Sequence, residues 1–275
     1  MNYKTVMVGL ALDRPNNACL RVAGDLAERF GARIIGAAAS DLRPPMYFAE
    51  GAVAQNLLDE EAAAVERRMS ELEAEFRAAV EKRATAVEWR SARALPVPHM
   101  LRQARAADIV VVGARPEALV DPCAAPDPSD LLMQLGRPLV VVPQAAEWLD
   151  LRSVLIAWKD GREARRAAFD ALPILAVATE VTVTEIPEQD GRRADALAHV
   201  ADVAAWLRGH GIAANTVVPE QAGGATAQIE SIAAHVGAGV VIAGAYGHSR
   251  LREWVLGGVT RHLATESRRC AFLSR

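Results

Sequence analysis

One stretch near the C-terminus carries the most information about this chain: Gly244-Ala-Tyr-Gly247-His-Ser-Arg-Leu-Arg-Glu-Trp-Val-Leu-Gly257-Gly258-Val-Thr260-Arg261. It follows a strongly apolar segment, residues 240–243, and precedes a helix-like segment, residues 259–266. Glycine lacks a Cβ atom, so the backbone can turn sharply and expose its N–H groups at close range. Glycines at both ends of a strand–loop–helix connection can form a cradle for phosphate oxygens, which the positive end of the helix completes. A glycine-rich turn without a ligand is the alternative interpretation.

The spacing of these glycines, Gly-x2-Gly-x9-Gly followed by a small residue and then x-Thr, resembles the C-terminal signature of the universal stress protein family. In nucleotide-binding members, the glycines and a hydroxyl side chain after the third one hold the phosphates of ATP. This chain departs from that pattern, because Gly258 stands at the hydroxyl position. The resemblance implies a nucleotide site made by Gly244, Gly247, His248, Gly257, Gly258, Val259, Thr260, Lys159 and Asp160.

The last two of these candidates come from the segment Ala157-Trp158-Lys159-Asp160-Gly161-Arg162-Glu163-Ala164. In ATP-binding relatives, an Asp at the end of strand one contacts the adenine. If Arg-Glu-Ala sets the register, Lys159 occupies that position and Asp160 is displaced by one; if the strand sets it, Asp160 can still reach the base. Asp160 is equally consistent with a turn residue that caps the next helix, and Thr260 with a cap of the helix from Arg261.

The length and composition of the chain limit which classes of protein it can belong to. The chain has 275 residues, of which 51% are apolar, and a formal net charge of −3, which predicts two ordinary globular domains. It contains no basic block for nucleic acid and no run near the ~18 apolar residues of a membrane span. Its start has no signal-peptide pattern, which predicts a cytoplasmic protein. Reduced, buried and inert thiols are expected at the three widely separated cysteines, Cys19, Cys123 and Cys270.

Short apolar segments alternate with amphipathic ones in two rounds, which predicts right-handed βαβ crossovers and parallel sheets covered on both faces. Strands are expected at residues 5–10, 33–39, 86–89, 109–112 and 139–142, and again at 154–158, 181–186, 213–218, 240–243 and 270–273. Helices are expected at residues 16–30, 58–80, 99–106 and 131–135, and again at 162–175, 194–209, 226–235 and 259–266. The predicted fold is α/β, with two tandem doubly wound units that each contain a five-stranded, mostly parallel sheet. The family resemblance implies an adenine nucleotide alpha hydrolase-like fold.

The two rounds are related by a constant register, which indicates an internal duplication. The segments beginning at Asp108 and Gly239 lie 131 positions apart, as do the last strands, while the first strands lie 148 positions apart. The predicted domains are residues 1–146 and 151–275. Because units of this family pair through their fifth strands, residues 139–142 and 270–273 are expected to pair within one molecule as a pseudo-dimer. Homodimerisation of whole chains is left open.

The same register predicts that the first unit has lost the phosphate cradle. Gly247 corresponds to Pro116, and the pair that begins at Gly257 corresponds to Pro126 and Asp127. Proline removes an N–H donor, and the carboxylate of Asp127 would repel phosphate. We therefore expect no nucleotide at the family position of residues 1–146, although Asp127 can cap the helix that follows it.

Sites of other kinds have no support in the sequence. No Walker A spacing or nucleophile elbow is present, so no catalytic residue is assigned. A surface position is expected, rather than a metal site, for the scattered histidines His99, His199, His210, His235, His248 and His262. The leading hypothesis is a non-enzymatic stress-response protein that binds ATP, with Mg²⁺, in its C-terminal domain and regulates a partner. Slow ATP hydrolysis, or an interaction protein that has lost the nucleotide, are the alternatives.

Overall fold

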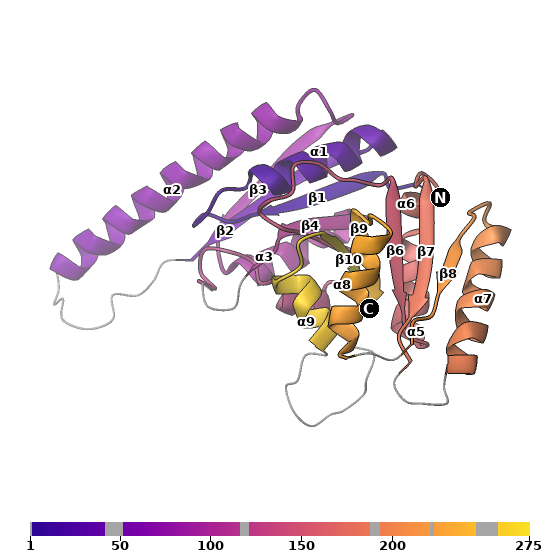
Figure 1. The fold of residues 1–275 in the computed structure, drawn as a ribbon. Coiled ribbons are helices and arrows are strands. Elements are labelled where there is room, and N and C mark those ends of the chain that lie inside the picture. The colour runs from indigo at the N-terminus through magenta and orange to yellow at the C-terminus, as the bar shows by residue number, and fades with distance from the viewer. Residues whose placement is uncertain (1, 42–51, 116–120, 188–192, 221–222, 246–257) are drawn as a thin grey trace.

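A computed structural model describes residues 2–41, 52–115, 121–187, 193–220, 223–245 and 258–275 (Figure 1). Its ten strands form one continuous sheet in the order β3-β2-β1-β4-β5-β10-β9-β6-β7-β8. The strands are β1 (Thr5–Leu10), β2 (Arg33–Ser40), β3 (Val87–Arg93), β4 (Ile109–Gly113), β5 (Leu139–Val142), β6 (Ser153–Trp158), β7 (Glu180–Glu185), β8 (Asn215–Val217), β9 (Val240–Gly244) and β10 (Cys270–Ser274). Each half of this order follows the same path, so the sheet consists of two five-stranded units, as predicted.

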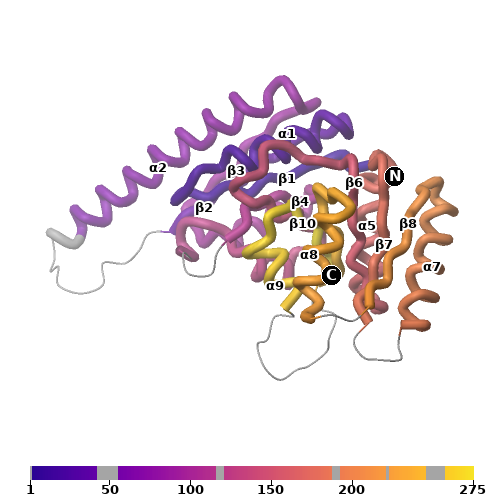
Figure 2. The backbone as a smooth tube through the Cα atoms, in the orientation of Figure 1, coloured from indigo at the N-terminus to yellow at the C-terminus, as the bar shows by residue number. Residues whose placement is uncertain are grey.

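The helices pack on both faces of the sheet, as doubly wound units require. They are α1 (Asn17–Phe30), α2 (Ala52–Val80), α3 (Pro96–Gln103) with the short 3₁₀ helix η1 (Ala104–Ala106), α4 (Pro128–Gln134), α5 (Arg162–Asp170), α6 (Leu172–Leu175), α7 (Arg193–Gly209), α8 (Ala225–His235) and α9 (Gly258–Thr265). One core lies under α1, α2, α5, α6 and α7, and the other lies under α3, α4, α8 and α9. Both cores contain residues of both units, and the tube in Figure 2 shows the two units side by side.

The two units are joined through their fifth strands, which confirms the predicted pseudo-dimer. β10 pairs with β5 in antiparallel register, with Phe272 opposite Val140, whereas every other neighbouring pair recorded in this sheet is parallel. Both side chains are almost fully buried. Each unit covers an edge strand of the other, and an exposed apolar edge is an aggregation hazard.

Three local predictions are wrong. The expected helix at residues 162–175 is divided into α5 and α6, because Pro173, in the first turn of α6, has no N–H to donate to the carbonyl group four residues earlier. His99 is buried rather than at the surface, with Nε2 3.2 Å from the carbonyl oxygen of Arg90. Cys123 is only partly buried, whereas Cys19 and Cys270 are buried as expected; all three thiols are free.

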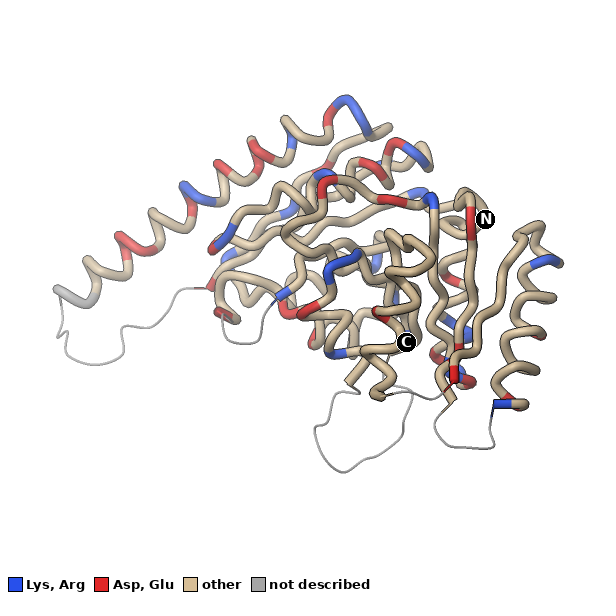
Figure 3. Tube along the Cα trace, in the orientation of Figure 1, with Lys and Arg blue, Asp and Glu red and all other residues tan. Residues whose placement is uncertain are grey.

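Helix α2 extends furthest from the sheet, and its first turns slant away from the neighbouring elements (Figures 1 and 3). Its buried core residues are Met69, Leu72, Phe76 and Val80, and the partly buried Val65 packs against the same core. Lys/Arg and Asp/Glu residues alternate along its length in Figure 3. Some of these side chains form ion pairs on the same helix, such as Arg68–Glu75 at 2.8 Å. Surface pairs of this kind contribute little stability.

The capping role predicted for Asp127 is confirmed, and it leads to a test of stability. Its carboxylate accepts hydrogen bonds from the backbone N–H groups of Ser129 (2.8 Å) and Asp130 (3.2 Å) at the start of α4. Asp127→Ala is expected to lower the free energy of unfolding by about 1 kcal/mol, because two N–H groups lose their acceptor. Urea denaturation would measure the loss, and Asp127→Asn, which keeps an acceptor, should retain most of the stability. An alanine variant as stable as the wild type would contradict this role.

Candidate functional site

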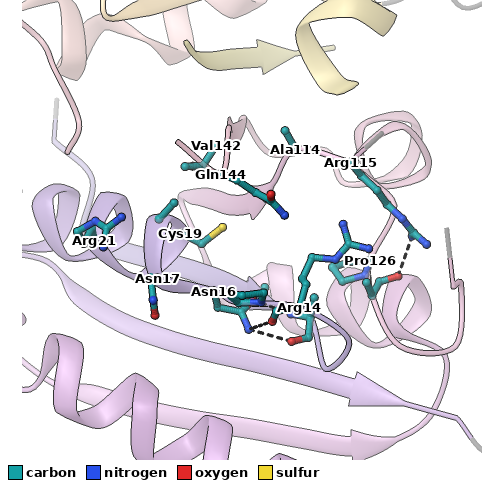
Figure 4. A pocket seen from close by; sticks show the side chains of 16 residues that line it. Arg14, Asn16, Asn17, Cys19, Arg21, Ala114, Arg115, Pro126, Val142 and Gln144 are labelled. Atoms are coloured by element: carbon teal, nitrogen blue, oxygen red, sulfur yellow. Dashed lines mark hydrogen bonds between the residues drawn. The ribbon is translucent and has the colours of Figure 1, made fainter. Parts of the chain in front are cut away.

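The first unit contains a cavity at the point where its strand order reverses, between β1 and β4. Open α/β sheets bind ligands at such a switch point, outside the carboxyl ends of the strands. The cavity has a volume of about 290 Å³. It lies among Gly9 and Ala11 at the end of β1, the first turn of α1, and Ala114 and Arg115 after β4 (Figure 4). Its described lining residues include three arginines and no carboxylate.

Two of these arginines, Arg14 and Arg115, lie at the same end of the cavity (Figure 4). Arg115 is only 2% exposed, and its Nη1 donates to the carbonyl oxygen of Ala125 at 3.3 Å. Burial lowers the pKa of Arg115, and the charge of Arg14 lowers it further, although Asp127 and Asp13 act in the opposite direction. Two like charges therefore lie near each other at one end of a cavity that an anion would suit.

The connection between β1 and α1 holds Arg14 in place. The side chain of Asn16 is buried and bonds to both backbone groups of Ala11, accepting from N at 2.9 Å and donating to O at 2.8 Å. Arg14 itself forms a two-point ion pair with Asp13, with Nε 2.9 Å from Oδ1. Cys19 lies in the cavity wall, and burial raises the pKa of its thiol to about 12. This thiol stays protonated at neutral pH and is no nucleophile.

The corresponding place in the second unit is filled by helix. Residues 11–16 connect β1 to α1, but only residues 159–161 connect β6 to α5. The shorter connection brings the first turn of α5 against Gly244, at the end of β9. A Cβ atom on Gly244 would lie 2.5 Å from the carbonyl carbon of Glu163 and 2.9 Å from Cα of Ala164. At the equivalent Gly113, the nearest atom is Sγ of Cys19 at 3.4 Å.

The charge at this place also differs between the units. The side chain of Glu163 is 7% exposed and pairs with Arg162. Burial alone would raise the pKa of the Glu163 carboxyl, but the hydrogen bond from Arg162 and a backbone hydrogen bond outweigh it, so the pKa is lowered. A buried carboxylate therefore stands in the second unit at the helix start, whereas arginines line the first-unit cavity.

The structure describes the positions of only some of the predicted residues of the second unit. Lys159 and Asp160 follow β6, which lies beside β9, so they are at the same edge of the sheet as Gly244. Asp160 is exposed, and its carboxylate accepts from Nη2 of Arg165 at 2.8 Å. It does not cap α5, because the N-cap residue is Gly161 and no side chain bonds there.

The remaining candidates lie at the start of α9 or outside the described residues. Gly258 and Val259 begin α9, and Thr260 is inside the helix and 6% exposed, so it is not the cap that was expected. A Cβ atom on Gly258 would meet only Oγ1 of Thr226, at 4.0 Å. Gly247, His248 and Gly257 lie outside the described residues, so the predicted cradle stays a prediction.

Sequence reasoning missed Arg14 and Arg115 as candidates. Arg14 lies in the connection after β1 and Arg115 in the connection after β4. Because they are far apart in the sequence, the sequence alone does not indicate that they lie close together. One feature of the sequence could have indicated the first-unit cavity. The connection after residue 10 is longer than the connection after residue 158, its equivalent in the second unit. The described residues contain no group of three or more His, Cys, Asp or Glu side chains that could hold a metal ion. Nor does any described helix have the length and apolar character of a membrane span.

No family model and no curated protein matches the sequence. Solved structures match the fold over its whole length. A universal stress protein from Archaeoglobus fulgidus DSM 4304 has a TM-score of 0.73 at 15% identity, and the match covers 98% of this chain and 96% of that one. A functionally unknown protein from Pseudomonas aeruginosa PAO1 has a TM-score of 0.59 at 14% identity, over 99% of this chain and 92% of that one. These matches confirm, at the level of the fold, the resemblance read from the glycine spacing.

Proposed function

We propose that this chain, which has the fold of the universal stress proteins, is a non-catalytic, cytoplasmic stress-response protein that binds an adenine nucleotide through its phosphates. The observation that carries the proposal is the first-unit cavity, where Arg14 and Arg115 face one space at the switch point of β1 and β4. A bound phosphate relieves their mutual repulsion and accepts charge-assisted hydrogen bonds from both. The adenine assignment comes from the family resemblance, because nucleotide-binding members hold ATP at this end of the sheet.

This proposal moves the main site from the second unit to the first, where no nucleotide was expected. Two features of the described residues support the change. Pro126 lines the cavity without filling it, and the carboxylate of Asp127 is engaged by the N–H groups of α4. The charge that was expected to repel phosphate is therefore partly satisfied by a helix N-terminus.

The glycine loop of the second unit is retained as a second candidate, with Mg²⁺ as a companion of ATP. It is favoured by the open space beside Gly258 at the start of α9 and by the family spacing of the glycines. The buried carboxylate of Glu163 and the close approach of α5 to Gly244 oppose it. Both sites can be tested in one protein, because their variants are independent.

We propose that nucleotide binding changes the conformation of the protein or its choice of partner, and that the nucleotide is not hydrolysed. Protein incubated with ATP and Mg²⁺ is expected to release phosphate no faster than a protein-free control. The buried, protonated Cys19 offers no nucleophile at the cavity. Release above the control that scales with protein concentration and disappears in Arg14→Gln would favour the slow ATP hydrolase instead.

Arg14→Gln tests the first-unit site. Loss of one guanidinium is expected to weaken ATP binding roughly tenfold in isothermal titration, because a charged hydrogen bond contributes about 1.5–3 kcal/mol. Adenosine should bind much more weakly than ATP, since it lacks the phosphates. Mass spectrometry of the freshly purified native protein would show whether a nucleotide co-purifies.

The second unit provides the matched control. Arg162 lies 148 positions after Arg14, the separation of the two first strands, and its side chain is 81% exposed. Arg162→Gln should leave ATP affinity within about twofold of the wild type, since surface charges contribute little. If Gly247→Pro abolishes binding while Arg14→Gln does not, the site lies in the glycine loop. No heat with ATP for the wild type would leave only the interaction-protein alternative.

A further inference from the structure

A second cavity lies in the second unit, between α5 and α7 and over the end of β6. Its volume is about 600 Å³, within the ~300–1,000 Å³ range of small-molecule sites. It shares no lining residue with the first-unit cavity. Its apolar walls are made mainly by three aromatic side chains, Trp158, Phe169 and Trp206.

One face of each helix forms the walls. On α7, the lining residues His199, Asp202, Val203 and Trp206 recur at steps of three and four. On α5, Arg165 is followed at the same steps by Ala168 and Phe169. Residues so spaced lie on one side of a helix, so two helix faces are directed at the same space. Phe169 is 42% exposed and Trp206 38% exposed, which leaves both rings open to a ligand.

Trp158 forms the floor and carries an unsatisfied polar group. It is 8% exposed, and its indole N–H is buried with no hydrogen-bond partner among the described residues. Because water cannot reach this nitrogen, Trp158 contributes apolar surface to the cavity rather than a hydrogen-bond donor. Leu10 stands at the corresponding position of the first unit, 148 positions earlier, so this indole ring belongs to the second unit alone.

The charge of the lining is negative overall. Asp160 and Asp202 contribute two carboxylates against the single guanidinium of Arg165, which pairs with Asp160 at 2.8 Å. No hydrogen bond or ion pair joins the side chain of Asp202 to another described residue. The cavity thus offers aromatic rings beside an uncompensated carboxylate, the environment in which proteins bind organic cations.

The corresponding helices of the first unit, α1 and α2, are joined by an ion-paired side chain. There Arg83, just after α2, bridges to α1 through Asp25 (2.5 Å) and Glu28 (2.6 Å). Its guanidinium and aliphatic stem lie against Gly24 of α1. No such bridge between α5 and α7 is found in the part of the chain that the structure describes.

We infer that the α5–α7 cavity is a binding site for a small organic cation with an aromatic or branched apolar body. The body lies against the rings of Phe169 and Trp206, and the cationic group lies near the carboxylate of Asp202. This site is independent of the anion cavity in the first unit.

The probe is benzoylcholine, which combines a quaternary ammonium, an ester carbonyl and a phenyl ring. Its neutral isostere, 3,3-dimethylbutyl benzoate, differs only in a carbon atom in place of the charged nitrogen. Saturable binding is expected in titrations followed by the indole ¹H–¹⁵N signals, with a shift of the signal that Trp158→Phe removes. The cation should bind roughly fivefold or more tightly than the isostere, as cation–π and carboxylate contacts imply.

The variants are placed at exposed positions, so that a loss of binding can be distinguished from a loss of folding. Asp202→Asn should remove most of the preference for the cation, and Trp206→Ala should weaken benzoylcholine roughly tenfold. Trp148→Ala is the matched control, because Trp148 is 54% exposed and lies outside the cavity. Equal affinity for the two probes, unchanged binding in Asp202→Asn and Trp206→Ala, or no saturable shift of the Trp158 signal up to about 10 mM would each overturn the inference.

Discussion

Phe272→Ala is expected to lower the free energy of unfolding by about 3–5 kcal/mol, the largest loss that we predict for this chain. Phe272 is fully buried on β10, opposite Val140 of β5 on one side and Ile242 of β9 on the other. Its removal leaves a cavity at the seam between the two units, where strands on both sides restrict collapse. The urea midpoint, followed by circular dichroism, would measure the loss.

Phe169→Ala is the control for this prediction, because it deletes the same side chain from a surface position that is 42% exposed. Its effect should stay below about 1 kcal/mol, as for most surface substitutions. If the two variants lost similar stability, the seam would contribute no more than the surface, and the continuous sheet would be in doubt. Separate unfolding of the two units in Phe272→Ala would instead support the role of the seam.

Gly244→Ala is expected to be the second most damaging change, with a loss of about 1–3 kcal/mol. The new methyl group would meet the backbone of Glu163 and Ala164, and backbone atoms of a packed helix cannot move aside as a flexible side chain can. The higher strand propensity of alanine offsets only a small part of this strain. Thermal and urea unfolding would both report it.

Gly113→Ala, at the equivalent position of the first unit, provides the comparison. There the nearest atom to the new methyl group is Sγ of Cys19 at 3.4 Å, which is close to ordinary contact. We expect a change below about 1 kcal/mol. Equal losses in both variants, or a harmless Gly244→Ala, would show that α5 does not pack against the end of β9 as described.

Most of the fold could be predicted because its signals are local and periodic. The strand at residues 5–10 follows from a short apolar run, whereas the pairing of residues 139–142 with 270–273 was implied by the family resemblance. The division of α5 from α6 was missed although Pro173 is visible in the sequence, because the apolar spacing continues across it. Burial of His99 could not be predicted, since it depends on a partner carbonyl on β3.

The candidate sites were less predictable, because they depend on distances between segments far apart in the chain. Arg14 and Arg115 are about a hundred positions apart, and only the parallel pairing of β1 with β4 brings them to one cavity. The α5–α7 cavity likewise requires two helix faces and the side chain of Trp158 to meet. Neither arrangement leaves a contiguous motif.

The sequence by itself determined the two repeated α/β units, and periodicity and register suffice for this because they report which face of each element is buried. Its glycine spacing resembles the universal stress proteins, and that resemblance implied the joining of the units through their last strands. Only the tertiary structure decided what Gly244 does. A glycine can either bind phosphate through its backbone N–H or allow another backbone to pack closely against it. Which role it has depends on how near another backbone segment lies. Here the short connection of residues 159–161 sets α5 against Gly244, while residues 11–16 leave a cavity between Arg14 and Arg115.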